Sequence, residues 1–174
     1  VYLTGLLLAG RRVVAVGGGH VHARRVPKLL AAGADVVVVA PELHPGLVAL
    51  AASGQISWQE REFAESDLDG AWYVLAATDD PHVNARVAAA AEARHTFCVR
   101  ADRGEAGSAW TPATATVPGA TIAVQASHDP RHARALRDRR ALEDHDDLVA
   151  QRRRLGQRGG GLEHGFALSR QRGL

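Results

Sequence analysis

Runs of apolar residues alternate with amphipathic segments along most of the chain. The first run, Val13 to Val16, is wholly apolar and ends at three glycines, which is typical of a strand buried on both faces. The segment His20 to Ala32 then places leucines and alanines at helical spacing and ends at Gly33, a residue favoured just after a helix. The β-branched run Asp35 to Val39 follows at once. Together the three segments predict a β-strand, a crossover helix and a second parallel strand.

The same alternation continues to about residue 101. Helices are expected at 45–53 and 81–94, and further strands at 55–59, 71–77 and 96–101. Strands and helices that alternate at these lengths predict an α/β fold, a Rossmann-like doubly wound parallel sheet with helices on both faces.

After Asp102 the pattern changes. Two strand-like runs, 113–117 and 121–125, flank Pro118-Gly119 and predict a hairpin. Asp129-Pro130 then reads as the start of an arginine-rich helix that extends to about Arg154, with an apolar stripe weak enough to need a partner subunit. We therefore expect a Rossmann-like domain at 1–112, a β-containing dimerisation region with a C-terminal helix at 113–155, and a disordered tail at 156–174.

Composition narrows the class of protein. With 174 residues, 46% of them hydrophobic and 23% charged, the chain has room for one globular domain and a small appendage. The single cysteine, Cys98, excludes an internal disulfide and a cysteine-based zinc site, and it fits a reducing cytoplasm. The apolar N-terminal stretch, residues 1–8, is too short to cross a membrane. We expect a cytoplasmic protein that does not associate with membranes.

The basic residues and the histidines give weaker indications of a binding site. Of the 21 basic residues, 11 fall within 131–174, where they could meet phosphates or the carboxylates of a polyanionic small molecule. The basic run 152–154 has no interleaved aromatic residues, so a nucleic-acid surface is disfavoured. His20 and His22 fall on different faces of a helix, which disfavours a histidine metal site.

The glycine loop is the first candidate for chemistry. Gly17 and Gly19 stand directly after a strand and before a helix, where backbone can approach a pyrophosphate and the helix N-terminus can hold its charge. The third small residue of the dinucleotide-binding fingerprint is replaced by His22. The loop predicts dinucleotide binding, with a tight structural turn as the alternative.

Two further strand ends could complete such a site. Pro41 and Glu42 follow the second strand, about where an acidic group would bond the ribose 2′-hydroxyl, and no arginine stands beside them to receive a 2′-phosphate. NAD is therefore favoured over NADP, although Glu42 is equally compatible with a solvated loop. Thr78 and Asp79 follow the fourth strand, where small neighbours leave space for a ligand. Asp79 or Asp80 could instead cap the next helix.

Several segments together resemble one known family. The runs Gly10 to Val21, Ala40 to Glu42, Asp69 to Trp72 and Ala76 to Asn84 are similar to the dehydrogenase/chelatase module of siroheme synthases. That family contains precorrin-2 dehydrogenase and sirohydrochlorin ferrochelatase. The similarity covers about residues 2–150 in the same order and spacing, which is more specific than any single glycine motif.

The resemblance implies a reaction and a set of residues. Family members act as homodimers that oxidise precorrin-2 to sirohydrochlorin with NAD, and many then insert ferrous iron, a lyase reaction. The family's cofactor contacts fall on His20, Val21, Pro41 and Glu42, and its essential aspartate falls on Asp102.

Asp102 at the end of a strand could accept the proton that leaves the substrate as the hydride goes to NAD. A tetrapyrrole that carries eight carboxylates also gives the arginines a partner, and the candidate substrate contacts are Arg100, Arg103, Arg131 and Arg134. The chain departs from the family pattern at Val99-Arg100 and at 126–130. The rival interpretation is a non-enzymatic NAD-binding sensor or regulatory domain, which would bind the cofactor without needing Asp102.

Overall fold

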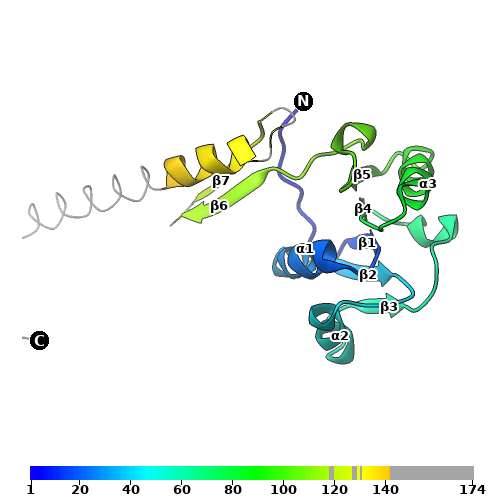
Figure 1. Ribbon diagram of the computed structural model, residues 1–174. Helices are drawn as coiled ribbons and strands as arrows, with labels where there is room; N and C mark the ends of the chain where they lie inside the picture. Colours follow the sequence, from blue (N-terminus) through cyan, green and yellow to red (C-terminus); the bar gives the residue numbers. More distant parts are fainter. Residues whose placement is uncertain (118–119, 127–128, 130, 142–174) are drawn as a thin grey trace, which may run out of the picture. The chain divides into compact units, whose positions relative to one another are not determined.

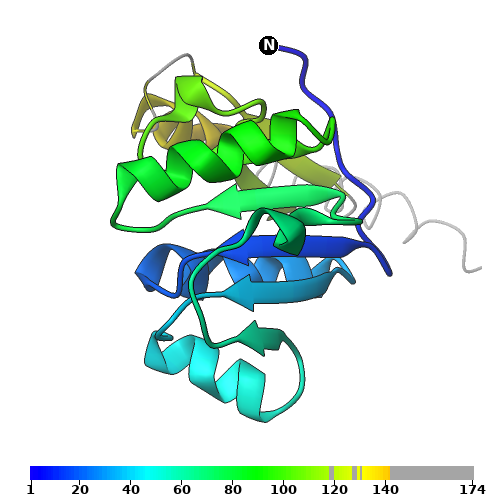
Figure 2. The same ribbon diagram turned by 90° about the vertical axis from the view of Figure 1, so that its right-hand side faces the viewer.

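The alternating apolar runs form one five-stranded parallel sheet in the order β3-β2-β1-β4-β5. In the computed structural model, which describes residues 1–117, 120–126, 129 and 131–141, these strands lie side by side with all their neighbours parallel (Figure 2). The strands are β1 (Arg12–Val16), β2 (Asp35–Val39), β3 (Ser57–Gln59), β4 (Tyr73–Ala76) and β5 (Phe97–Arg100). The predicted Rossmann-like fold is confirmed.

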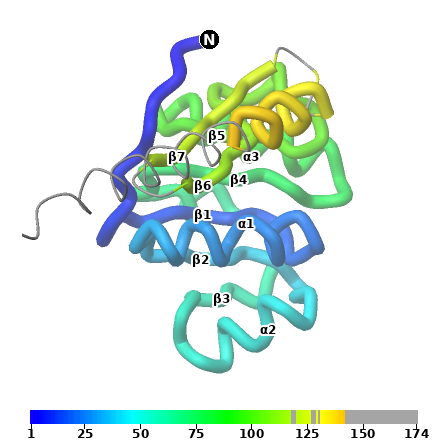
Figure 3. The backbone as a smooth tube through the Cα atoms, turned by 90° about the vertical axis from the view of Figure 1, so that its left-hand side faces the viewer, coloured from blue at the N-terminus to red at the C-terminus, as the bar shows by residue number. Residues whose placement is uncertain are grey.

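Helices cover both faces of this sheet. The helices are α1 (His20–Ala31), α2 (Pro45–Ala52) and α3 (Pro81–Glu92). Figure 1 shows α1 and α3 on opposite faces, and Figure 3 shows α1 in front of β1 and β2. Alternate residues of β1 serve the two faces, since Val13 and Ala15 join the core cluster that Leu47 of α2 completes, whereas Val14 and Val16 join the cluster around Val87 of α3.

Two local details differ from the sequence predictions. The third strand begins at Ser57 rather than at Gln55 because the Gln55 backbone N–H donates to Leu50 O and closes the end of α2. In α1 the fully buried side chains are His22 and Val26, while the leucines of that helix are only partly buried. The sequence pattern did not single out His22 as a core residue.

A second compact unit begins at Pro112, and the first spans Val1–Thr111. Strand β6 (Ala113–Val117) pairs antiparallel with β7 (Ala120–Val124), as the predicted hairpin requires. A helix covers residues 131–141, and Asp129 caps it by accepting hydrogen bonds from the backbone N–H groups of Arg131 and His132, both at 2.9 Å. The expected extension to Arg154 and the expected tail at 156–174 lie outside the described residues.

Candidate functional site

A cleft of about 790 Å³ opens at the carboxyl ends of the central strands. It lies where β1 is flanked by β2 on one side and β4 on the other, which is the point at which the strand order reverses. Ligands of open α/β sheets bind at such switch points. The lining includes six of the residues expected from the sequence, namely Gly17, Gly19, Pro41, Glu42, Thr78 and Asp79.

The glycine loop is shaped first by contacts within the protein. Gly17 has φ +112°, and a Cβ there would lie 2.4 Å from Ala77 O. A Cβ on Gly18 would lie 1.8 Å from Glu42 O. A Cβ on Gly19, in contrast, would meet no atom within 4 Å. The first two glycines are therefore required by the fold, and the third leaves open space over the start of α1.

Three hydrogen bonds fix this loop. Gly17 N donates to Val39 O at 2.9 Å, and His44 N donates to Gly18 O at 2.7 Å. The third bond joins His22 Nδ1 to Gly17 O, also at 2.7 Å. Because a carbonyl oxygen can only accept, Nδ1 must carry the proton. The loop is thus held from β2, from the segment after β2 and from α1.

His22 takes the neutral form in this position. Its side chain is fully buried, and burial lowers the pKa of the imidazole to about 4. Its Nε2 makes no hydrogen bond of normal geometry to the described residues, although the backbone of Leu75 acts on the ring and opposes part of the fall in pKa. His22, which replaces the third small residue of the glycine fingerprint, therefore holds the loop in place.

The start of α1 is suited to an anion. Gly19 is its N-cap and has no side chain to bond the free N–H groups of the first turn, which also lacks an acidic residue. Backbone N–H groups without a side-chain cap can bind a pyrophosphate at this end. His20 and Val21 supply the first backbone groups of the helix, although their side chains are not among the cleft-lining residues that the structure describes.

The segment after β2 forms a second wall. Pro41, Glu42 and His44 line the cleft, and Trp58 Nε1 donates to Ala40 O at 2.9 Å to fix where this segment begins. Phe63 also lines the cleft. Phe63 could not be predicted from the sequence, and neither could Glu62 or Arg86, because no motif links these residues to the glycine loop.

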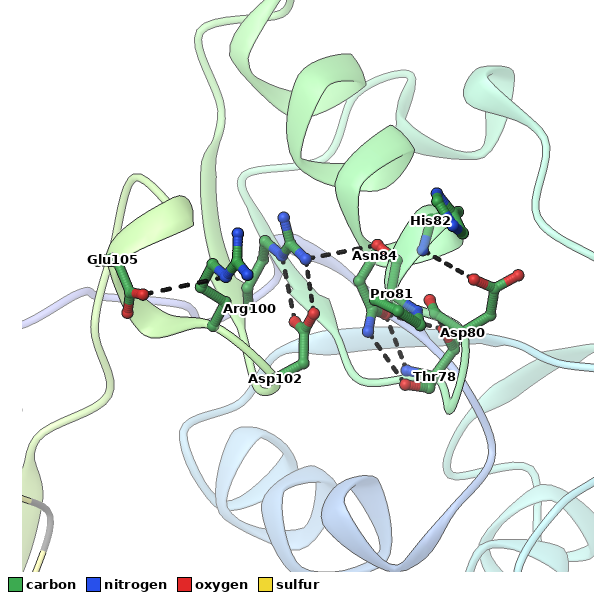
Figure 4. A network of polar contacts seen from close by, with 9 residues as sticks. Thr78, Asp80, Pro81, His82, Asn84, Arg100, Asp102 and Glu105 are labelled. Carbon is green, nitrogen blue, oxygen red and sulfur yellow. Dashed lines mark hydrogen bonds and ion pairs between the residues drawn. The ribbon is translucent and has the colours of Figure 1, made fainter.

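The segment after β4 is organised by a buried asparagine. Asn84 is fully buried, and its Oδ1 accepts from Thr78 N at 3.0 Å and from Thr78 Oγ1 at 2.9 Å. Its Nδ2 donates to Thr78 O at 3.0 Å (Figure 4). Asp80 caps α3 by accepting from His82 N at 2.7 Å, and both Asp79 and Asp80 line the cleft. Asn84, which was not among the site residues predicted from the sequence, positions Thr78.

Asp102 lies just after β5 and outside the lining of the cleft. Arg100 donates to both of its oxygens, from Nε at 3.1 Å and from Nη2 at 2.5 Å (Figure 4). This hydrogen-bonded guanidinium lowers the pKa of the Asp102 carboxyl below its usual value of 3.8. Asp102 is therefore ionised at neutral pH.

The other arginines expected to meet substrate are exposed. Arg103 lies 4.0 Å from Glu105, and both side chains are more than 60% exposed. Arg131 and Arg134 are exposed on the helix of the second unit. Arg100 differs from these three, since its side chain is only 9% exposed and is already paired.

Among residues 1–117, 120–126, 129 and 131–141, no three or more histidine, cysteine, aspartate or glutamate side chains gather as a metal site would require. Within the same residues, no helix has the length and apolar character needed to span a bilayer.

Comparisons with known proteins agree with the geometry of the cleft. A family model described as "Putative NAD(P)-binding" matches residues 6–113. A siroheme synthase from Chromobacterium violaceum is 42% identical over 135 residues, which is 77% of this chain and 29% of that protein. One from Escherichia coli O157:H7 is 40% identical over 133 residues, 76% of this chain and 29% of that protein. These relatives confirm the resemblance to siroheme synthases that the sequence motifs indicated.

A solved structure extends the similarity to three dimensions. The structure titled "SirC, precorrin-2 dehydrogenase" superposes with a TM-score of 0.72 at 25% identity, over 82% of this chain and 71% of that one. The chain spans only 17% to 29% of the length of the siroheme synthases that it matches. The similarity therefore concerns one module of those longer proteins.

Proposed function

Because the chain belongs to the NAD(P)-binding family whose model matches residues 6–113, we propose that it oxidises precorrin-2 to sirohydrochlorin with NAD. The observation that carries the proposal is the cleft at the switch point, built by a glycine loop on a scaffold that superposes on a precorrin-2 dehydrogenase with a TM-score of 0.72. The similarity to siroheme synthases supports siroheme biosynthesis as the pathway of this reaction.

The residues of the cleft fit a dinucleotide. The open space over Gly19 and the uncapped start of α1 suit a pyrophosphate, and Glu42 suits a ribose hydroxyl. Four carboxylates, those of Glu42, Glu62, Asp79 and Asp80, line the cleft together with one arginine, Arg86. This excess of negative charge disfavours the extra phosphate of NADP. When bound, NAD supplies the hydride acceptor.

The proton that leaves the substrate needs a separate acceptor. Oxidation removes a hydride and a proton, and the Asp102 carboxylate is ionised and partly exposed, with 27% of its side chain accessible. It follows β5, the neighbour of β4, whose carboxyl end borders the cleft. We assign Asp102 as the proton acceptor, and Arg103, Arg131 and Arg134 as contacts for the substrate carboxylates.

Anaerobic turnover of precorrin-2 with NAD tests the proposal. Formation of sirohydrochlorin and NADH would be followed for the unaltered chain, for Asp102→Asn and for Asp69→Asn. Asp69 is a matched control, because it is also an arginine-paired aspartate but is 68% exposed and precedes β4, at the amino end of the strand, whereas Asp102 follows the carboxyl end of β5. We expect turnover by the unaltered chain and by Asp69→Asn, and a loss of at least about 100-fold in Asp102→Asn.

Two other outcomes would change the assignment. Equal turnover by Asp102→Asn would retain the dehydrogenase but remove Asp102 as proton acceptor. Absence of turnover by folded chain that binds NAD would contradict the dehydrogenase and favour a cofactor-sensing domain.

We also propose that the chain forms a homodimer and that it inserts ferrous iron in a second reaction. A two-stranded sheet such as β6-β7 is marginal by itself, which supports a homodimer that buries this region. The single cysteine, Cys98, is compatible with a cytoplasmic location for it. Light scattering after size-exclusion chromatography tests the dimer, and a monomeric mass would contradict it. Adding ferrous iron to the product of the first reaction tests the metal insertion that the family resemblance implies.

A further inference from the structure

The Arg100–Asp102 pair lies at the end of a central strand and has a geometry that a surface ion pair lacks. Arg100 is the last residue of β5 and pairs in register with Ala76 of β4. The backbone continues in that register, since Ala101 N donates to Ala76 O at 2.9 Å. The backbone on which Arg100 stands is therefore held by the sheet.

The side chain of Arg100 is held as firmly as its backbone. It points to the same face of the sheet as Cys98, two residues earlier, and this face packs against α3. Only 9% of the side chain is exposed, and a buried guanidinium is rarely found without a partner. Beyond its bonds to Asp102, its Nη2 donates to Pro81 O at 3.4 Å, in the first turn of α3 (Figure 4).

Arg100 holds the carboxylate of Asp102 through two hydrogen bonds, one to each oxygen. Nε meets Oδ1 and Nη2 meets Oδ2, which is the bidentate fork that guanidinium and carboxylate groups form. A lysine at this position could supply the charge but not the fork. The pair therefore specifies the orientation of the carboxylate plane as well as its ionisation.

We propose that Arg100 is a positioning residue, which holds the carboxylate of Asp102 in a fixed orientation through its guanidinium fork. This inference rests on the proposed dehydrogenase function. It differs from the role that the sequence suggested for Arg100, a direct contact to a substrate carboxylate, because the fork is already engaged by Asp102 and by Pro81 O.

The two roles predict different kinetics. A positioning residue acts on the chemical step, so Arg100→Ala should lower kcat by about 10- to 100-fold, the effect of a misplaced catalytic group, and leave KM for precorrin-2 within about twofold. Arg100→Lys should recover only part of kcat. Arg94→Ala is the matched control, because Arg94 forms the exposed pair with Asp69 and should keep full activity.

Rescue by free guanidinium separates positioning from general damage to the fold. Arg100→Ala leaves a space the size of a guanidinium beside Asp102, so millimolar guanidinium should restore kcat by at least about tenfold, whereas ammonium, which has no fork, should not. A rise in KM with unchanged kcat would overturn the proposal in favour of substrate binding. Unchanged kcat and KM, or failure of guanidinium to rescue a folded variant, would also overturn it.

A second measurement does not depend on turnover. Carbon-13 NMR of the Asp102 carboxyl, recorded without substrate, reports whether the pair exists in solution. We expect the pKa of Asp102 to lie below 3.8 in the unaltered chain and to rise in Arg100→Ala. The same titration in both proteins would refute the pairing whatever the enzyme does. If the unaltered chain fails to turn over precorrin-2 while the titrations differ, the dehydrogenase proposal fails and the pairing stands.

Discussion

Replacing Gly19 by alanine tests the glycine loop without disturbing its fold. A Cβ at Gly19 would meet no protein atom within 4 Å, whereas a Cβ at the adjacent Gly18 would lie 1.8 Å from the backbone oxygen of Glu42. Gly19 also has φ −82° and ψ −172°, an extended conformation that alanine adopts without strain. Gly18→Ala and Gly19→Ala are therefore two neighbouring variants with the same added methyl group and opposite structural consequences.

The two variants should differ in stability. In Gly19→Ala the unfolded chain loses conformational freedom, which stabilises the fold by about 0.4–1 kcal/mol, and alanine is a poorer N-cap than glycine by a similar amount. The free energy of unfolding should therefore stay within about 0.5 kcal/mol. In Gly18→Ala the backbone around Glu42 must move, at a cost of about 1–3 kcal/mol. For a chain of this length, that cost lowers Tm by roughly 2–12 °C.

Gly19→Ala, the variant with the smaller effect on stability, should show the more specific loss of NADH binding. In Gly19→Ala the new methyl group occupies space where the pyrophosphate would approach the start of α1, a steric penalty of about 1–3 kcal/mol. This penalty weakens NADH binding by roughly 5- to 150-fold. Adenosine lacks the pyrophosphate, so its binding should be the same in Gly19→Ala and in the unaltered chain.

Fluorescence titration with NADH and thermal unfolding on the same samples measure both quantities. NADH affinity within about twofold of the unaltered value in Gly19→Ala would refute the assignment of the open space to a phosphate. Equal losses of adenosine and NADH binding would show instead that the methyl group disturbs the whole cleft.

Three further predictions concern the residues that shape the cleft. Because the folded His22 has a pKa of about 4 and the unfolded residue about 6.5, the unfolded chain binds an extra proton between these values, so the free energy of unfolding should fall by about 2 kcal/mol from pH 7 to pH 5. Urea unfolding at the two pH values checks this, and an equal fall in His22→Asn would contradict it. Asn84→Ala removes three bonds to Thr78 and should cost about 2–4 kcal/mol by urea unfolding, a prediction that a cost below about 1 kcal/mol would exclude. Glu42→Gln removes a carboxylate from the cleft and should strengthen NADP binding by about 3- to 10-fold in a direct titration; unchanged NADP affinity would remove Glu42 from cofactor selection.

The sequence by itself determined the fold class, because that information is local. Continuous β-branched runs such as Val13 to Val16 can be satisfied only in a sheet covered on both faces. Glycines between such a strand and a helix mark a turn that only a few folds use. The segments after the first, second and fourth strands could be assigned to one site because the carboxyl ends of parallel strands meet at one edge.

Only the tertiary structure decided which side chains work together. His22 interrupts the glycine fingerprint, and its role as a brace depends on the 2.7 Å distance to Gly17 O. Arg100 and Asp102 are two residues apart in the sequence, but the structure was needed to show that the guanidinium bonds both carboxylate oxygens and also reaches Pro81 O in the first turn of α3. Phe63 reaches the cleft from a segment with no motif. Such contacts depend on how the chain crosses over the sheet, so they cannot be predicted from the hydrophobic periodicity of the sequence.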